Sequence, residues 1–112
     1  MNIVPFNFDI DIPSLRSAFE LTHIEGKILQ LLMQKEIASH EQLAEINERV
    51  RQLIYTLRIK LRIKKAGIII NSDRDIGYSI SIRDKLHIKN IIDADLIEEV
   101  EIANRIAERF IS

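Results

Sequence analysis

The chain has 112 residues, of which 46% are hydrophobic, with no cysteine and a formal net charge of −1. A chain of this length forms one domain and can bury roughly 65% of its unfolded surface. The lack of cysteine excludes disulfides, thiolate metal sites and a thiol nucleophile. No apolar run approaches the ~20 residues of a membrane span, and the acidic start lacks the basic region of a signal peptide. We therefore expect a cytoplasmic protein.

Residues 1–20 are predicted to form an N-terminal arm. Hydrophobic residues alternate loosely between residues 2 and 12, which fits one or two short strands or an extended segment packed on the domain. A brief helical turn is expected over Ser14–Glu20, with Leu15 and Phe19 directed inward.

Two helices with capping boxes are predicted next. Thr22 and Glu25 have the spacing at which each side chain satisfies a backbone N–H of the other. The helix that they begin has apolar residues at helical spacing, at Ile24, Ile28, Leu31 and Leu32. Ser39 and Gln42 repeat the pattern at the start of a short helix, HEQLAEI, which is predicted to bury Leu43 and Ile46.

The third predicted helix, residues 47–62, concentrates the positive charge. Asn47 is its expected N-cap, and its buried stripe is predicted at Val50, Ile54, Leu57 and Leu61. From Arg49 to Lys65 there are seven basic residues and no acidic one, whereas the chain before this segment has three basic and eight acidic residues. Such a distribution favours a surface that docks on a polyanion, with an ordinary solvated basic face as the alternative.

A β-hairpin is predicted to follow. Ile68–Ile70 begins a β-branched run, Asn71–Gly77 has turn composition, and Tyr78–Ile82 alternates like a returning strand. Two short helices joined by a tight turn, the second of them basic, are typical of a helix-turn-helix. The predicted fold class is therefore α+β: a winged helix-turn-helix, with a three-helix core and a C-terminal β-hairpin wing, plus an extra C-terminal helix.

Four motifs follow each other along residues 21–82: LTxxE from Leu21, S-x-E-x-L from Ser39, V-x-x-x-I-x-x-L-R-x-K-L from Val50, and I-x-I-x-x-x-R-x-x-G-Y from Ile68. In this order and spacing they resemble the OmpR/PhoB-type winged helix-turn-helix DNA-binding domain. It implies a stand-alone, sequence-specific regulator of transcription, of bacterial or phage type, that binds double-stranded DNA. It also implies that helix 47–62 enters the major groove and that wing 68–82 places Arg74 at the minor groove or an adjacent phosphate.

Three departures from the family pattern limit these expectations. The long loop between the second and third helices, which the family uses to contact RNA polymerase, shrinks to about Glu45–Asn47. A polymerase contact is therefore in doubt, and repression by occlusion is favoured over activation. Asp75 stands where the wing usually has glycine, and its charge should weaken the contact with DNA. No receiver domain precedes the winged helix, so phosphorelay control is not expected from this chain.

The residues expected to contact DNA form a row beside the buried stripe of the third helix, together with its neighbouring exposed positions and the wing. Arginine can read guanine with two hydrogen bonds and glutamine can read adenine, but which side chains read bases stays open. Lys60, Arg62, Lys64 and Lys65 are expected to follow the phosphate backbone. The predicted DNA-binding residues are Arg49, Arg51, Gln52, Tyr55, Thr56, Arg58, Arg62 and Arg74.

No cofactor, metal or catalytic site is predicted. His23, His40 and His87 lack metal-ligand spacing, and the first two are expected to be surface residues just inside helix starts. The chain has no Gly-rich phosphate loop and no convincing nucleophile–base pair, so an enzyme is the least supported class. The competing interpretation is a winged-helix protein-interaction module without specific DNA binding, because a fold does not fix a function.

Residues 83–112 lie outside the family pattern and are predicted to form a C-terminal helical extension. An apolar stripe with spacings of 4 and 3 runs along its second half, at Leu96, Val100, Ala103, Ala107 and Phe110. Such a face must be covered. It either folds back on the N-terminal segment or pairs with a second subunit in a homodimer, and both alternatives stay open.

Overall fold

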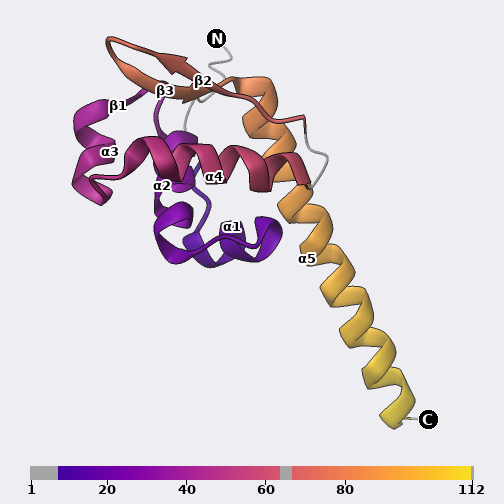
Figure 1. The fold of residues 1–112 in the computed structure, drawn as a ribbon. Coiled ribbons are helices and arrows are strands. Elements are labelled where there is room, and N and C mark those ends of the chain that lie inside the picture. The colour runs from indigo at the N-terminus through magenta and orange to yellow at the C-terminus, as the bar shows by residue number, and fades with distance from the viewer. Residues whose placement is uncertain (1–7, 64–66, 112) are drawn as a thin grey trace.

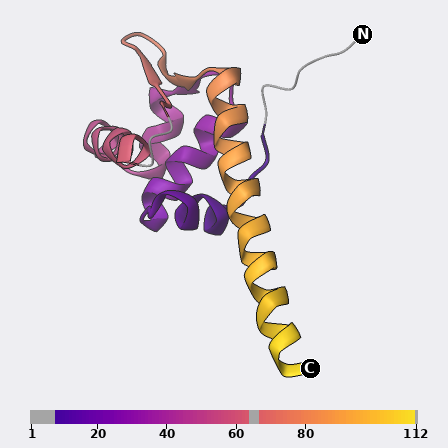
Figure 2. The same ribbon diagram turned by 90° about the vertical axis from the view of Figure 1, so that its right-hand side faces the viewer.

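The computed structural model describes residues 8–63 and 67–111, which form an α+β fold (Figure 1). The described helices are α1 (Ile12–Phe19), α2 (His23–Gln34), α3 (His40–Ile46), α4 (Val50–Ile63) and α5 (Ile82–Ile111). The described strands are β1 (Ala38–Ser39), β2 (Ile70–Asp73) and β3 (Gly77–Ile80), which form an antiparallel sheet in the order β1–β3–β2. Figure 2 shows α4 and α5 on opposite sides of the domain, with α2 and α3 between them. The two outer helices therefore present separate faces.

The N-terminal arm contains a full helix where only a helical turn was predicted. The Asp11 carboxylate accepts a hydrogen bond of 2.7 Å from the Ser14 N–H and caps α1. Pro13 lies in the first turn, where its missing N–H leaves no helical hydrogen bond unmade. Leu15 and Phe19 are buried, as predicted.

Residues 8–11 form no strand, so the strand prediction is wrong for this described part of the arm, and residues 2–7 lie outside the described residues. The packed extended arm is the alternative that the structure confirms here. The Phe8 N–H donates to the Met33 carbonyl oxygen at 3.0 Å, and the Gln30 amide donates to the Ile10 carbonyl oxygen at 3.0 Å. Because Phe8 and Ile10 also pack against the hydrophobic core, the arm is held along α2.

Both predicted capping boxes are present, at Thr22–Glu25 before α2 and at Ser39–Gln42 before α3. The predicted buried face of α2 needs one correction, because Ile24 is 38% exposed. Leu29 and Met33 are fully buried instead, because α2 is covered on several sides by α1, α3, α4 and β3. Leu43 of α3 is fully buried, as predicted.

The hairpin exists, but its strands are displaced from the predicted ranges. β2 begins at Ile70 and extends to Asp73, so the turn is confined to Arg74–Ile76. The Asp73 carboxylate closes this turn by accepting from the N–H groups of Asp75 at 3.0 Å and Ile76 at 3.2 Å. Strand β1 was not predicted at all.

Gly77 permits the close pairing of β1 with β3. A Cβ atom at this position would lie 1.9 Å from the carbonyl oxygen of Ala38, a separation that no side chain tolerates. The glycine therefore allows the hairpin to lie against the segment that enters α3.

Helix α5 starts at Ile82, and its first turns pack against the rest of the domain. Lys85 and Ile88 are fully buried. The Lys85 ammonium donates to the carbonyl oxygen of Lys35 at 2.7 Å, at the end of α2. Burial lowers the pKa of Lys85, and the nearby charge of Glu36 opposes this shift.

From residue 93 to residue 109 every position of α5 is exposed, and the helix projects away from the domain (Figures 1 and 2). Near the start of this exposed segment, Asp95, Leu96 and Glu99 line a groove beside α1. Folding back on the N-terminal segment therefore accounts for α5 only at these residues. The apolar face beyond residue 99 is uncovered. Within the described part of the chain, no helix is both long enough and apolar enough to cross a membrane.

Candidate nucleic-acid interface

The structure confirms the predicted buried stripe of α4. Burial of this stripe fixes which side of the helix faces outward. Ile54, Leu57 and Leu61 are at most 1% exposed, and Val50 is half-buried. The helix begins at Val50, so the prediction of Asn47 as its N-cap is wrong. Asn47 instead ends α3, and its side-chain oxygen accepts a hydrogen bond of 2.8 Å from the Arg49 N–H.

One flank of α4 is attached to α2 through the buried carboxylate of Glu25. This carboxylate accepts hydrogen bonds from the Thr56 hydroxyl at 3.0 Å and from the Lys60 ammonium at 2.6 Å. It also accepts from the Thr22 N–H at 2.9 Å as part of the capping box. Thr56 and Lys60 are therefore engaged within the protein, although both were predicted to contact DNA.

The hydrogen bonds to Glu25 lower its pKa. Burial acts to raise the pKa, but the hydrogen bonds from Lys60, Thr22 and Thr56 together outweigh burial and hold the pKa below its ordinary value. Glu25 is therefore charged at neutral pH and keeps Lys60 fixed on this flank of α4.

The other flank of α4 is attached to the hairpin through Arg58. Its guanidinium donates to the Ile70 carbonyl oxygen at 2.6 Å and to the Ser72 hydroxyl at 2.8 Å, and it lies 5.9 Å from the centre of the Tyr78 ring. Arg58 is half-buried, which corrects its predicted place on the exposed part of the helix. Arg58 lies on the side of α4 next to the buried stripe, and the hairpin covers that side.

His40 attaches the tip of the hairpin to the start of α3. Its Nε2 atom lies 3.2 Å from the Asp73 carbonyl oxygen and 3.0 Å from that of Arg74. Because both partners are acceptors, the imidazole must carry a proton on Nε2. The His40 N–H also donates to the Ile76 carbonyl oxygen at 3.0 Å. His40 is half-buried and holds the hairpin from the surface of the domain.

The remaining predicted side chains of α4 are exposed. Within the part of the chain that the structure describes, the side chains of Arg49, Arg51 and Arg62 make no ion pair and donate no hydrogen bond, unlike those of Arg58 and Lys60. Gln52 is also exposed, and Tyr55 is 66% exposed. These five residues, Arg49 just before α4 and the other four on it, are therefore available to a partner. Lys64 and Lys65 lie outside the described residues.

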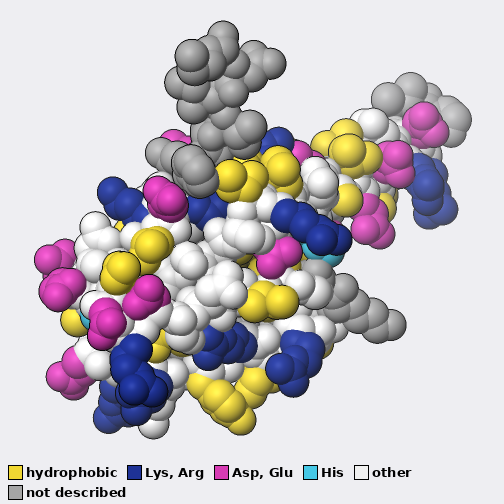
Figure 3. Space-filling view, turned by 90° about the horizontal axis from the view of Figure 1, so that it is seen from above, with side chains coloured by type: hydrophobic (Ala, Val, Ile, Leu, Met, Phe, Trp, Pro, Cys, Tyr) yellow, Lys and Arg dark blue, Asp and Glu magenta, His cyan; other side chains and the backbone are white. Residues whose placement is uncertain are grey.

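Three neighbouring hollows bring the predicted residues together along α4. The first lies between α4 and the hairpin, and it is lined by Arg51, Arg58 and Arg74 together with His40 and Tyr78. The second, at the start of α4, is lined by Arg49, Gln52, Tyr55 and Thr56, and the third includes Arg58 and Arg62. Lys and Arg side chains accordingly gather along the lower edge of Figure 3, over α4 and the hairpin. Each of the eight predicted residues therefore lines one of these three hollows, which together are called the α4 face.

This face is not purely polar. Ile59 of α4 is 39% exposed and Ile63 is 70% exposed, and both lie near the outward side with Tyr55. Among the described residues, no cluster of His, Cys, Asp and Glu side chains is arranged to hold a metal ion. The face therefore offers cations, one glutamine amide and apolar groups, and the Asp73 carboxylate lies beside them.

Comparisons with models of protein families, with curated proteins and with solved structures found no match for this chain. The function is therefore argued from the geometry of this face.

Proposed function

We propose that this chain is a winged helix-turn-helix protein that binds a specific site on double-stranded DNA and regulates transcription by occupying it. The order α2, β1, α3, α4, β2, β3 and the sheet order β1–β3–β2 fit this fold. The observation that carries the proposal concerns α4. Two of its cations hold the helix in place, while three further arginines at its start and along it stay exposed and unpaired among the described residues.

In the proposed complex α4 lies in the major groove, which is about 12 Å wide and admits a helix. Gln52 and Tyr55 point away from the core and would face base edges, while Arg51 and Arg62 flank them. A bidentate contact of arginine with guanine or of glutamine with adenine discriminates between bases by about 1–3 kcal/mol. Arginines that meet phosphates instead contribute affinity without sequence information.

The attachments of α4 and the hairpin support this mechanism because they fix the binding surface before DNA arrives. Arg58 holds β2 against α4, and His40 holds the turn at Arg74. A preformed surface loses less conformational entropy on binding, so more of the contact energy appears as affinity. Arg74 then lies on the same side as Arg51, where it can contact a phosphate across the edge of the groove.

One observation favours a second candidate, a protein-interaction module. Tyr55, Ile59 and Ile63 expose apolar surface on α4, and apolar contacts are common at the centres of protein interfaces. In the DNA-binding proposal the same groups would meet thymine methyl groups. The two candidates differ in their dependence on charge, because phosphate contacts make affinity fall steeply with salt.

Selection of bound sequences from a random duplex pool tests the proposal. The expected result is enrichment of one sequence by the wild-type chain, and loss of that enrichment in Arg51→Ala. The control is Lys27→Ala, which removes an exposed cation of α2 and should enrich the same sequence as the wild type. Absence of any enriched sequence would contradict specific DNA binding and favour the interaction module.

A further inference from the structure

We propose that the exposed half of α5, residues 93–109, pairs with the same segment of a second copy of this chain in antiparallel orientation. The surface concerned lies on the opposite side of the domain from α4 (Figure 2). The inference is therefore independent of what α4 binds.

The exposed half of α5 has more apolar surface than an isolated helix should show. Leu96, Ile97, Val100 and Ile106 are between 50% and 60% exposed. A lone helix of this length is only marginally stable in water, because most helical stability comes from packing of an apolar face. Leu96, Val100, Ala103 and Ala107 follow each other at spacings of 4 and 3, the pattern of two paired helices.

The charge distribution indicates the occupant of this face. Residues 93–101 include five acidic residues and no basic one, whereas residues 102–109 contain Arg105, Arg109 and a single acid, Glu108. Parallel pairing would place the two acidic segments side by side, which is unfavourable. Antiparallel pairing places each acidic segment beside the basic segment of the other copy. The segment is therefore complementary to itself in one orientation.

The sizes of the apolar side chains indicate the register. When Val100 faces Ala103 of the second copy, Leu96 faces Ala107, so that a large side chain meets a small one at each level. This alternation allows close packing of two helices without voids.

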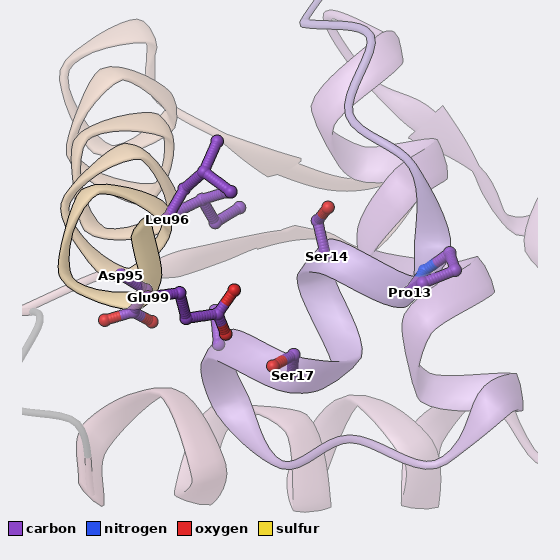
Figure 4. A pocket seen from close by; sticks show the side chains of 8 residues that line it. Pro13, Ser14, Ser17, Asp95, Leu96 and Glu99 are labelled. Carbon is purple, nitrogen blue, oxygen red and sulfur yellow. The ribbon is translucent and has the colours of Figure 1, made fainter. Parts of the chain in front are cut away.

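A groove beside α1 continues the same face toward the domain. Figure 4 shows Leu96, Asp95 and Glu99 of α5 opposite Ser14 and Ser17 of α1. The groove thus extends the pairing surface at the point where α5 leaves the domain.

Pairing in this register leaves both α4 faces uncovered. The two Ile92 residues, at which α5 leaves each domain, would be separated by about 28 Å along the helices, given 1.5 Å per residue. On the proposed function, such a dimer presents two DNA-binding faces to two half-sites. The pairing itself does not require DNA.

Sedimentation equilibrium on the full chain tests the pairing. The wild-type chain should have twice the mass of one chain at micromolar concentration, and Val100→Glu should have the mass of one chain, because it places a charge in the centre of the stripe. Ala94→Glu introduces the same side chain on the opposite side of the helix and should stay dimeric. A monomeric wild type, or a dimer that Val100→Glu leaves intact, would overturn the proposal.

Engineered cysteines test the orientation, since the natural chain contains none. A mixture of Leu96→Cys and Ala107→Cys chains should form mixed disulfides under mild oxidation. Leu96→Cys alone should not crosslink, because its two copies would be about 16 Å apart, far beyond disulfide reach. Efficient crosslinking of Leu96→Cys alone would show parallel pairing and overturn this orientation. Binding of Val100→Glu monomers to a single half-site tests the proposed function separately.

Discussion

Arg58 and Lys60 of α4 make hydrogen bonds within the protein, whereas Arg51 and Arg62 on the same helix make none within the described residues. The anchored cations, Arg58 and Lys60, lie near the edges of the buried stripe, where the hairpin and α2 cover them. The free cations, Arg51 and Arg62, are exposed and line the hollows beside the hairpin segment without bonding to it. The number of positive charges on α4 therefore overstates the number available to a polyanion, and the anchored pair determines where the free cations point.

The largest expected effect belongs to a free cation. Arg51→Ala should weaken binding to the selected duplex by roughly 1–3 kcal/mol, because one base or phosphate contact is lost. Its free energy of unfolding should change little, since the exposed side chain makes no hydrogen bond or ion pair within the described residues. Fluorescence anisotropy and chemical denaturation measure the two quantities. Unchanged affinity would remove Arg51 from the interface and weaken the distinction between free and anchored cations.

Replacement of an anchored cation should affect both quantities. Arg58→Ala leaves the Ile70 carbonyl oxygen and the Ser72 hydroxyl without their donor, so the free energy of unfolding should fall by about 1–2 kcal/mol. Binding should also weaken, because the hairpin loses its attachment to α4. Ser72→Ala is a useful control, since it removes only one of the two acceptors and should have a smaller effect. Full stability of Arg58→Ala would contradict the anchoring role.

The other anchor predicts a pH dependence. Glu25→Gln removes the charge that holds Lys60, and it should lower the free energy of unfolding at neutral pH by about 1 kcal/mol. The pKa of Glu25 is lowered from its ordinary value of 4.5 in the folded protein, so its contribution is present above that value and disappears as pH falls through the lowered pKa. Denaturation across this pH range should show the wild type and Glu25→Gln converging in acid. A difference that does not depend on pH would contradict the assignment.

The smallest expected effect concerns the tip of the hairpin. Arg74→Ala should reduce the slope of log affinity against log salt by about one, as expected for the loss of one phosphate contact. Asp75→Gly should tighten binding slightly, because it removes a negative charge from the same turn. An unchanged slope would mean that the hairpin does not touch the DNA.

Local patterns in the sequence predicted the framework of the domain. The stripe at Ile54, Leu57 and Leu61 and the two capping boxes depend on residues within one or two helical turns, so periodicity and spacing were sufficient. The start of α1 also has a local signal, Asp11 followed by Pro13, which a search for N-caps with proline in the first turn would have found.

The anchoring contacts could not be predicted in the same way. Glu25 and Lys60 are 35 residues apart, and His40 and Arg74 are 34 apart, so nothing local relates them. In the sequence Arg58 cannot be distinguished from the exposed cations of the same helix, because its partners Ile70 and Ser72 lie on the hairpin. The sequence therefore located the candidate face, but only the three-dimensional contacts separate the residues that build it from the residues that can bind.

The central claim is that α4 and the hairpin bind DNA through the free cations. Amide chemical shifts measured by NMR during titration with the selected duplex test it most directly. The account predicts shifts concentrated at Arg51, Gln52, Tyr55 and Arg62 and at the Arg74 turn, with residues 93–109 of α5 unaffected at constant oligomeric state. Shifts confined to α5, or no shifts at an excess of duplex, would contradict it.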